Sequence, residues 1–317
     1  MQTLVTSSAT ALAHNGPPPG SALIRIADAA DLLPAPMGAA AVLDCVFHDV
    51  TECGPGYIRP PAVGDALQIR DFAMAHESLP RLVVCCTAGV GRSQAVVAAL
   101  TRIRGGDPRP IIRQGTYNRL LYRLLLESAC VPIEPDPLVS MVVRVKYYED
   151  RLQAFILCME RQRYENWEII AVTDSPTLPH CVLGYKESVV KVITVDKPLG
   201  RWGHPYRQLG IDAARGEYIG LNNDDNLLCP GFLEQLVFAA KDTGYPMAAC
   251  QMIHRYSGWS VVPAGTDLAC WIAHRDLVRQ AKWPGNEFTS DQDYFTELLG
   301  LAGGRCAEVR RPLVMKN

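Results

Sequence analysis

The chain has 317 residues, of which 48% are hydrophobic and 20% charged, and its formal net charge is −2. This composition is that of a globular protein and gives no support to a general nucleic-acid binder, so no nucleic-acid partner is expected. Domains usually hold about 100 to 200 residues, and the length therefore predicts two domains.

The sequence also bears on location. Its first 20 residues contain neither Lys nor Arg and no long apolar core, so no signal peptide is expected. No run approaches the roughly 20 apolar residues of a membrane span. The cysteines number 11, which is odd, and we expect free thiols in a reducing cytoplasm.

Two segments of the chain are expected to lack regular structure. Residues 1–21 are small, polar and rich in Pro and Gly, which predicts a flexible tail. The segment CVPIEPDPLVS, at 130–140, carries three prolines and two acids, which is typical of a linker. We therefore expect one domain at 22–129, a linker at 130–137 and a second domain at 138–317.

The first domain contains two candidate strands and two candidate helices. AAVLDCVFHDV and RLVVCC are apolar enough to be buried strands, and PPAVGDALQIRDFAMAHESL has the period of a helix. RLVVCC runs into the segment CTAGVGRS, and a second helix is expected in SQAVVAALTRIR. A strand, a Gly-containing loop and a helix N-terminus together predict an anion site, because loop N–H groups and the helix dipole favour negative charge.

The residue types of CTAGVGRS suit a phosphate ligand. Gly89 and Gly91 allow backbone conformations that other residues rarely adopt. Cys86 lies at the mouth of the loop, where a thiol should lose its proton easily. The fork of Arg92 can hold two oxygens of a tetrahedral dianion.

This segment resembles the protein tyrosine phosphatase signature, Cys-x5-Arg-Ser/Thr, and residues 22–129 are most similar to the small dual-specificity type. The resemblance implies that Cys86 attacks phosphorus and forms a phosphocysteine, that Arg92 binds the equatorial oxygens, and that Ser93 helps the thiolate leave. It implies that the phosphate-binding loop consists of Thr87, Ala88, Gly89, Val90 and Gly91. No cofactor is expected here, and the substrate would be a phosphorylated small molecule or protein.

The resemblance also implies an acid on a separate loop that protonates the leaving oxygen. Asp49 in FHDVTE is the best match, because it follows a strand and precedes a Gly/Pro loop, and Glu52 is the alternative. Asp65 and Asp71 are expected at solvated helix positions.

The sequence departs from the family pattern at Cys85, where the family usually has a His that fixes the loop and lowers the pKa of the nucleophile. Cys85 either traps an oxidised Cys86 or is a buried thiol at the end of a strand.

The second domain begins with a strand–helix–strand unit. VSMVVRV is an apolar strand, a helix with an apolar stripe follows, and WEIIAVTD is a second buried strand. The stripe consists of Leu152, Phe155, Ile156 and Met159. Such a unit predicts a parallel sheet, whose ligands bind beyond the carboxyl ends of the strands.

A third strand, EYIGL, ends in the five oxygen-rich residues 222–226, with the sequence NNDDN. Carboxylate and amide oxygens suit Mn²⁺ or Mg²⁺ carrying a diphosphate. The alternative is an ordinary Asn/Asp turn.

In order, RQRYENWEIIAVTD and AARGEYIGLNNDDNLLCPGFLE resemble a family 2 glycosyltransferase of the GT-A type, over residues 138–317. The resemblance implies a nucleotide contact at Asp174 and an Asp-x-Asp motif that holds metal and sugar diphosphate. In this motif Asn223 and Asp224 bind the nucleotide-sugar and Asp225 binds the metal. Arg207 matches a basic position near the donor, and a surface salt bridge is its alternative role.

An inverting transferase needs a carboxylate base at the acceptor hydroxyl. The resemblance favours Asp291, and Asp293 is either its replacement or a helix-capping residue. Lys316 stands where relatives often carry a His.

Three further residues of this domain have open roles. Asp267 is a candidate sugar or acceptor contact. Trp271 and Trp259 either stack on sugar or pack in the core.

The expected fold class is thus α/β with two domains: a phosphatase-like sheet with flanking helices, and a GT-A domain that is Rossmann-like. The expected function is metal-dependent, inverting glycosyl transfer from a nucleotide-sugar to an unknown acceptor, together with phosphomonoester hydrolysis. The competing hypothesis is a binding protein that holds phosphate and nucleotide-sugar without reacting them, because Cys85 and Asn223 depart from the family motifs.

Overall fold

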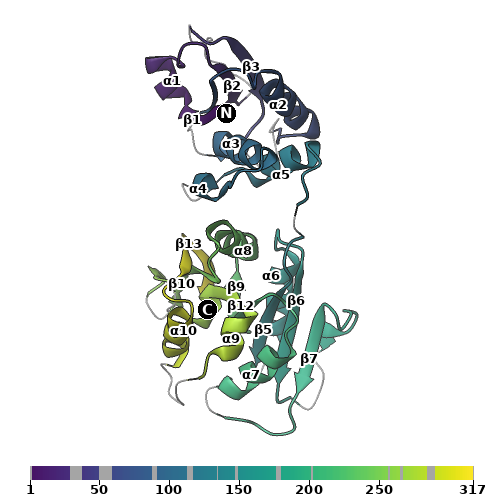
Figure 1. The fold of residues 1–317 in the computed structure, drawn as a ribbon. Coiled ribbons are helices and arrows are strands. Elements are labelled where there is room, and N and C mark those ends of the chain that lie inside the picture. Colours follow the sequence, from purple (N-terminus) through teal and green to yellow (C-terminus); the bar gives the residue numbers. More distant parts are fainter. Residues whose placement is uncertain are drawn as a thin grey trace. The chain divides into compact units, whose positions relative to one another are not determined.

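The structure is a computed structural model that describes residues 2–28, 38–49, 59–87, 91–112, 117–133, 135–146, 149–175, 180–200, 203–255, 258–264, 267–283 and 290–316. Its α-carbon contacts divide the chain into two compact units, Met1–Pro135 (unit 1) and Asp136–Asn317 (unit 2). The division falls inside the segment that the sequence marks as a linker. Both units combine helices with parallel strands, as the expected α/β class requires (Figure 1).

Unit 1 contains a parallel sheet whose order in the described residues is β1-β4-β2-β3. Its strands are β1 (Thr3–Ser8), β2 (Ala22–Ala27), β3 (Ala41–Val46) and β4 (Arg81–Cys86). Its helices are α1 (Ala9–Asn15), α2 (Val63–Ala75), α3 (Gly91–Ile103), α4 (Arg109–Ile112) and α5 (Arg119–Ser128).

Strand β4 lies inside this sheet and is buried on both faces. Successive side chains of a strand point to opposite faces. Val84 and Cys86 pack in the main core with residues of α2, α3 and α5, whereas Val83 and Cys85 pack with Leu12 of α1. The two adjacent cysteines therefore belong to different cores.

The expectation of a flexible tail at residues 1–21 is wrong. Strand β1 pairs with β4 in parallel, with Thr3 opposite Arg81, and the Ser8 hydroxyl caps α1 by accepting a hydrogen bond from Ala11 N at 3.1 Å. Small polar residues can form a strand when a distant segment supplies the pairing, and local composition does not report such a partner.

Asp65 is also not the solvated helix residue that the sequence indicates. It is buried in the first turn of α2, accepts a hydrogen bond from Ala62 N at 2.8 Å, and pairs with Arg59 at 2.7 Å. Asp71, by contrast, has an exposed side chain, as expected.

Unit 2 contains a mixed sheet whose order in the described residues is β7-β6-β5-β8-β12-β10-β13-β9, with β11 paired to β10. Its strands are β5 (Val139–Val145), β6 (Trp167–Thr173), β7 (Val190–Thr194), β8 (Tyr218–Asn223), β9 (Asn226–Leu228), β10 (Met247–His254), β11 (Ser260–Val262), β12 (Trp271–His274) and β13 (Cys306–Lys316). Its helices are α6 (Glu149–Glu160), α7 (His204–Ala213), α8 (Phe232–Thr243), α9 (Arg275–Gln280) and α10 (Ser290–Leu301), with 3₁₀ turns η1 (His180–Val182) and η4 (Leu268–Cys270).

The strand–helix–strand unit is confirmed as β5-α6-β6, since β5 and β6 pair in parallel. Strands β7, β6, β5 and β8 run in the same direction, so their carboxyl ends lie along one edge. Residues of α6 and α8 pack in one core of this sheet, and residues of α7, α9 and α10 pack in the other. The predicted stripe of α6 is buried throughout: Leu152, Phe155, Ile156 and Met159.

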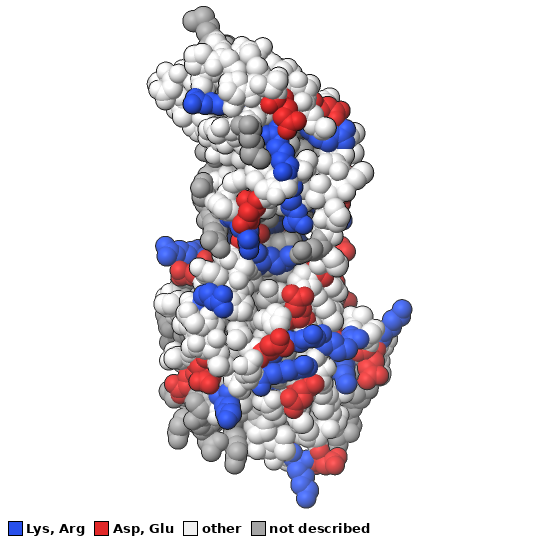
Figure 2. All heavy atoms as spheres, viewed as in Figure 1, with Lys and Arg blue, Asp and Glu red and all other residues white. Residues whose placement is uncertain are grey.

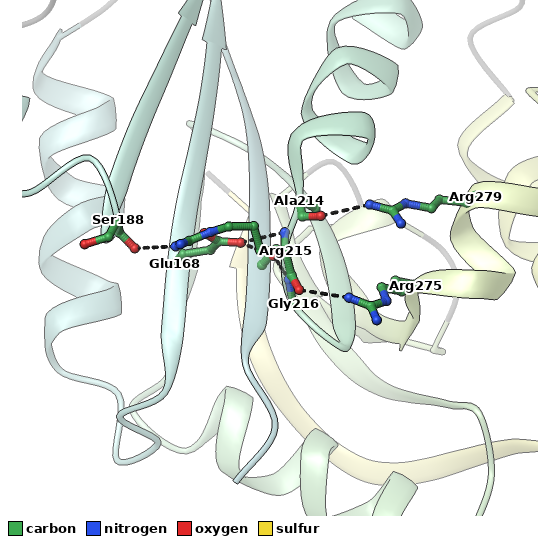
Figure 3. A network of polar contacts seen from close by, with 8 residues as sticks. Glu168, Ser188, Ala214, Arg215, Gly216, Arg275 and Arg279 are labelled. Carbon is green, nitrogen blue, oxygen red and sulfur yellow. Dashed lines mark hydrogen bonds and ion pairs between the residues drawn. The ribbon is translucent and has the colours of Figure 1, made fainter. Parts of the chain in front are cut away.

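The amino ends of β5 and β6 are fixed by a polar network around Glu168, which is buried (Figure 3). Its carboxylate accepts hydrogen bonds from Ser140 Oγ at 2.6 Å, from Arg215 N at 2.9 Å, and from Arg215 Nε and Nη2 at 2.8 and 2.6 Å. Arg275 and Arg279 donate to the carbonyls of Arg215 and Ala214. This network ties the loop before β8 to the edge of the sheet opposite the expected ligand site.

Surface charges of both signs are interleaved. On the face drawn in Figure 2, Lys and Arg side chains lie beside Asp and Glu, without a broad area of one sign. Among the residues that the structure describes, no helix combines the length and apolar character needed to cross a bilayer.

Candidate functional site

The candidate site of unit 1 begins where β4 ends. Cys86 is the last residue of β4 and Ser93 lies in the first turn of α3, and their Sγ and Oγ atoms are 3.4 Å apart. Both side chains are buried. The expected loop residues Ala88, Gly89 and Val90 lie outside the described part of the chain. The end of β4 and the start of α3 nevertheless bring the thiol and the hydroxyl into contact.

Arg92 precedes Ser93 in α3, and three hydrogen bonds hold its guanidinium. Its Nη1 donates to Phe47 O at 2.6 Å and to Asp28 Oδ1 at 2.9 Å, and its Nη2 donates to Thr87 Oγ1 at 3.1 Å. Its Nε is buried and has no hydrogen-bond partner among the described residues. A buried donor without a partner costs free energy, so this N–H is suited to an anionic ligand.

Asp49 lies directly over the start of α3. Its Oδ1 accepts a hydrogen bond from Asn118 Nδ2 at 3.0 Å. A β-carbon built on Gly91 would lie 1.9 Å from Asp49 Oδ2. Gly91 is therefore needed for space and not for an unusual backbone, since its φ is not positive. The alternative acid, Glu52, lies outside the described residues.

Cys85 is unsuited to react. Its burial, and next the neighbouring Cys86, raise the pKa of Cys85 to about 11, so it remains a thiol at neutral pH. It packs with Leu23 and Val83 on the face away from Ser93. Of the two roles considered for Cys85, the buried thiol at the end of a strand fits this placement.

The candidate site of unit 2 lies at the carboxyl ends of its parallel strands. Asp174 directly follows β6, and its Oδ2 accepts a hydrogen bond from the Tyr206 hydroxyl at 2.7 Å. The same hydroxyl accepts from Leu199 N at 2.9 Å. Arg144, near the end of β5, lies over the Tyr206 ring at 5.2 Å. The Asp174 carboxylate is thus fixed at the edge where ligands of such sheets bind.

Arg207 of α7 is buried, so the alternative of a surface salt bridge is wrong. Its Nη2 donates to Asn223 Oδ1 at 2.7 Å, and its guanidinium lies 5.8 Å from the centroid of the Trp283 ring. Burial lowers the pKa of Arg207, and the nearby Asp291 opposes this shift.

The five oxygen-rich residues divide into two groups. Asn222 Oδ1 accepts from Asn223 N and from Asn226 Nδ2, both at 2.8 Å, so these amides stabilise the turn between β8 and β9. Asp224 is buried and accepts from Lys146 N at 3.2 Å, and its burial raises its pKa. Asp225 differs, because its Oδ1 is buried and accepts no hydrogen bond from the described residues.

A second pair of carboxylates faces Arg207 from later in the chain. Asp291 lies in the first turn of α10, and its pKa is raised by burial and lowered by Arg207. Asp267 is buried, caps η4 by accepting from Ala269 N at 3.0 Å, and pairs with Lys316 Nζ at 2.5 Å. Asp293 is exposed in the same turn as Asp291.

These residues form one charged cluster of three carboxylates and two cations. Asp267, Asp225 and Asp291 act electrostatically on both Arg207 and Lys316. Burial lowers the pKa of Lys316, but the charge and hydrogen bond of Asp267, together with the charges of Asp225 and Asp291, outweigh it, and the net shift is upward. The cluster gathers residues from α7, the β8–β9 turn, α10 and the end of β13 at one place.

An aromatic stack lies beside the cluster, and the sequence does not reveal it. His204 stacks on Trp283 at 4.3 Å, and Trp283 stacks on Tyr294 at 4.0 Å. Trp271 is fully buried next to Tyr294, so it packs in the core, whereas Trp259 is exposed. The three stacked rings come from α7, from the segment after α9 and from α10, and no spacing along the chain relates them.

The donor set for a metal is small. Among the described residues, no group of three or more His, Cys, Asp or Glu side chains could hold an ion. The buried and unpartnered Oδ1 of Asp225 fits one ligand to a cation whose other ligands come from a bound diphosphate.

The family comparison concerns unit 2. A family model, "Glycosyl transferase family 2", matches residues 140–313, more than half of the chain. No curated protein matches the chain.

Several solved structures are similar at low identity. A crystal structure of S. aureus TarS is 15% identical with a TM-score of 0.47, covering 56% of this chain and 60% of that one. TarS in complex with UDP-GlcNAc is 16% identical with a TM-score of 0.47, covering 56% of this chain and 58% of that one. The mannosyltransferase PcManGT from Pyrobaculum calidifontis, in complex with GDP-Man and Mn²⁺, is 15% identical with a TM-score of 0.43, covering 71% of this chain and 67% of that one. The chain thus spans about 60% of TarS 1–349 and 36% of the longer TarS chain, and these scores carry no conclusion about substrate.

Proposed function

Since the chain belongs to glycosyl transferase family 2, we propose that unit 2 transfers a sugar from a nucleotide-sugar to an acceptor hydroxyl, with inversion at the anomeric carbon. The observation that carries this proposal is the buried cluster around Arg207, where Asn223, Asp225 and Asp291 converge at the carboxyl ends of the strands.

The residues at this site have roles that follow from their charges or their contacts. Asp174 contacts the nucleotide, and Arg207 and Lys316 attract the diphosphate, whose negative charge grows as it leaves. Asp291 takes the proton of the acceptor hydroxyl. The hydroxyl oxygen attacks the anomeric carbon at the same time, and the bond from that carbon to the diphosphate breaks. Asn223 keeps Arg207 in place, and Asp224 supports the turn.

A divalent cation fits this site through the Oδ1 of Asp225. Mn²⁺ or Mg²⁺ bound with the diphosphate would neutralise part of the leaving charge. Arg207 and Lys316 supply two positive charges in the same cluster. We therefore expect the divalent ion to increase the affinity for the nucleotide, and some affinity to remain without it.

A calorimetric experiment tests the site. Asp225→Ala should remove the Mn²⁺-dependent part of nucleoside-diphosphate binding, and Asp224→Ala, which loses a hydrogen bond from Lys146 N after β5, should retain it. If Asp224→Ala removes the metal dependence and Asp225→Ala does not, the metal ligand is Asp224.

Turnover is tested with a panel of nucleotide-sugars that includes UDP-GlcNAc and GDP-Man. Hydrolysis or transfer with at least one donor is expected when Mn²⁺ is present. Binding of donors without any turnover would instead support the competing hypothesis of a nucleotide-sugar-binding protein.

A second function, phosphomonoester hydrolysis, is proposed for unit 1. It rests on the contact of Cys86 with Ser93, the buried Nε of Arg92, and the Asp49 carboxylate over Gly91. The Cys86 sulfur would attack phosphorus while Asp49 gives a proton to the leaving oxygen. Water would then attack the phosphocysteine and return a proton to Asp49, and phosphate and the thiolate would be released.

Two adjacent thiols provide a matched test. Cys86→Ser should abolish hydrolysis of a small aryl phosphate, and Cys85→Ser should keep a substantial part of it, because Cys85 packs on the other face of the sheet. Vanadate should protect Cys86 from alkylation. Equal loss of activity in the two variants would contradict the assignment of Cys86 as nucleophile.

A further inference from the structure

We propose that Asn118 is the positioning residue that holds the general acid Asp49 in place, an inference that rests on the proposed hydrolysis by unit 1. Asn118 immediately precedes α5 and is 5% exposed. Neither the phosphatase signature nor the segment around Asp49 contains it, since it lies 69 residues after Asp49.

Asn118 joins three parts of unit 1. Its Nδ2 donates to Asp49 Oδ1 at 3.0 Å, and its Oδ1 accepts from Leu121 N at 2.9 Å, which caps α5. Its backbone N–H donates to Gly91 O at 3.1 Å, at the start of α3. Because the amide oxygen is engaged by the helix cap, the amide nitrogen must face Asp49, and the orientation of the side chain is fixed.

The arrangement leaves one oxygen of Asp49 able to deliver a proton. Oδ1 accepts from Asn118, whereas Oδ2 lies over the α-carbon of Gly91, beside the helix that carries Arg92 and Ser93. Asp49 is exposed, and within the described part of the chain its side chain has no other hydrogen-bond partner. Asn118 is therefore what keeps this exposed carboxyl group beside the start of α3.

The chemical consequence depends on the leaving group. As the ester bond to phosphorus breaks, its electron pair goes to the leaving oxygen, which then takes the proton from Asp49. A phenolate is a much stronger base than a p-nitrophenolate and needs that proton more. Loss of the Asn118 contact should therefore slow hydrolysis of phenyl phosphate more than hydrolysis of p-nitrophenyl phosphate.

Asn118→Ser tests this inference in the full-length chain. Serine keeps an oxygen that can cap α5 but is too short to reach Asp49. We expect kcat for phenyl phosphate to fall about tenfold or more and kcat for p-nitrophenyl phosphate about threefold or less. These losses are smaller than the full rate factor of general acid catalysis, because the variant displaces Asp49 without removing it. In an Asp49→Asn background, Asn118→Ser should have no further effect on phenyl phosphate, because the two residues act together.

The pH dependence of kcat in Asn118→Asp is a second test, because a residue that only caps α5 would not change it. The new carboxylate also caps α5, and its charge beside Asp49 should hold the proton on Asp49 to higher pH. The decline of kcat for phenyl phosphate on the alkaline side should therefore shift upward in pH.

The outcomes separate the two proposals. If the wild-type chain hydrolyses neither ester, the proposed phosphatase function fails. If it hydrolyses both, but Asn118→Ser slows both equally or adds its full effect to that of Asp49→Asn, Asn118 is only a helix cap and the inference is overturned.

Discussion

At Gly91, the absence of a side chain decides where a carboxylate can lie. A methyl group there would occupy the position of Asp49 Oδ2. Alanine itself is compatible with the first turn of α3, because Gly91 has no positive φ. Glycine is therefore required at this position to leave space for the carboxylate of Asp49, and not to allow the backbone conformation.

Gly91→Ala should therefore displace Asp49 without unfolding unit 1. We expect hydrolysis of phenyl phosphate to fall about tenfold or more, with a smaller loss for p-nitrophenyl phosphate. Gly64→Ala is the matched control, because a β-carbon at Gly64 in α2 meets no atom within 4 Å. Steady-state rates for both esters check this. A displaced acid is ruled out if Gly91→Ala behaves like Gly64→Ala.

Asp291 and Asp293 offer a second pair in the same helical turn. Asp291 is partly buried beside Arg207, whereas Asp293 is exposed. Asp291→Asn should lower transfer about a hundredfold to ten-thousandfold, with nearly unchanged nucleoside-diphosphate affinity, because a base acts on the acceptor. Asp293→Asn should cause only a mild loss. The reverse pattern would exchange the roles of the two residues.

The pH dependence of transfer follows from the same burial. Burial raises the pKa of Asp291, and a base works only when it is deprotonated. As the pH falls, transfer should therefore begin to decline at a higher pH than it would if Asp291 had the ordinary pKa of an aspartate. A pH profile of kcat/KM, with Asp293→Asn as a reference of unchanged shape, measures this.

Candidate residues can be named from sequence where chemistry is concentrated in a short segment. The signature CTAGVGRS identifies Cys86, Arg92 and Ser93, and the structure brings the thiol and the hydroxyl together. Asn118 could not be found in this way, because an isolated Asn in YNRL has no spacing relation to Asp49. The pairing of Lys316 with Asp267 likewise depends on β13 ending beside η4.

At the scale of elements, the two ends of the unit 2 sheet have different tasks. The carboxyl ends carry the charged cluster, and the amino ends carry the network of Glu168, Arg215 and Ser140 (Figure 3). The network satisfies a buried carboxylate with hydrogen bonds, which makes removal of its charge costly. Its role is to hold the loop before β8, and so to set the strand that delivers the oxygen-rich turn.

Glu168→Gln should destabilise unit 2 by about 2 to 3 kcal/mol, because it weakens charge-assisted bonds to Arg215 and leaves one of its N–H groups without its ionic partner. Glu308→Gln is the control, since its partner Arg310 is largely exposed and such pairs contribute about 0 to 1 kcal/mol. Urea unfolding of the two variants compares them. Equal losses would contradict a structural role for the network.

The sequence predicts elements well where periodicity and burial agree. VSMVVRV and WEIIAVTD appear as β5 and β6, and the apolar stripe between them is the buried face of α6. Strand β1 could not be predicted, because TLVTSS has only a weak pattern and gains its stability from pairing with β4. The half of the unit 2 sheet from β12 to β9 is equally hidden, since its strand order does not follow the order of the chain.

At the scale of the whole molecule, the buried apolar side chains separate into clusters that each belong to one unit. Two clusters of described residues lie in unit 1 and two in unit 2. A unit with its own core can unfold as its own cooperative transition.

Ligands should therefore stabilise the two transitions separately. In calorimetry, vanadate should raise only the transition of unit 1, and a nucleoside diphosphate with Mn²⁺ should raise only that of unit 2. A ligand at 100 times its Kd adds about 2.7 kcal/mol to the unit that binds it. Cys86→Ser and Asp225→Ala identify which transition belongs to which unit. A single transition that responds to both ligands would contradict this expectation.

The position of β1 has a consequence for synthesis of the chain. Strand β1 is made first, but it pairs with β4, with Thr3 opposite Arg81. At about 5 to 20 residues per second, β1 leaves the ribosome roughly 4 to 16 s before its partner. Strands β2 and β3 pair with each other and are complete before β4, but the second side of β2 stays unpaired until β4 inserts between β1 and β2. Strand β4, which carries Cys86, is thus the last strand of this sheet to be made. A nascent chain therefore cannot place the Cys86 thiol in its native surroundings until all four strands of the sheet have been made.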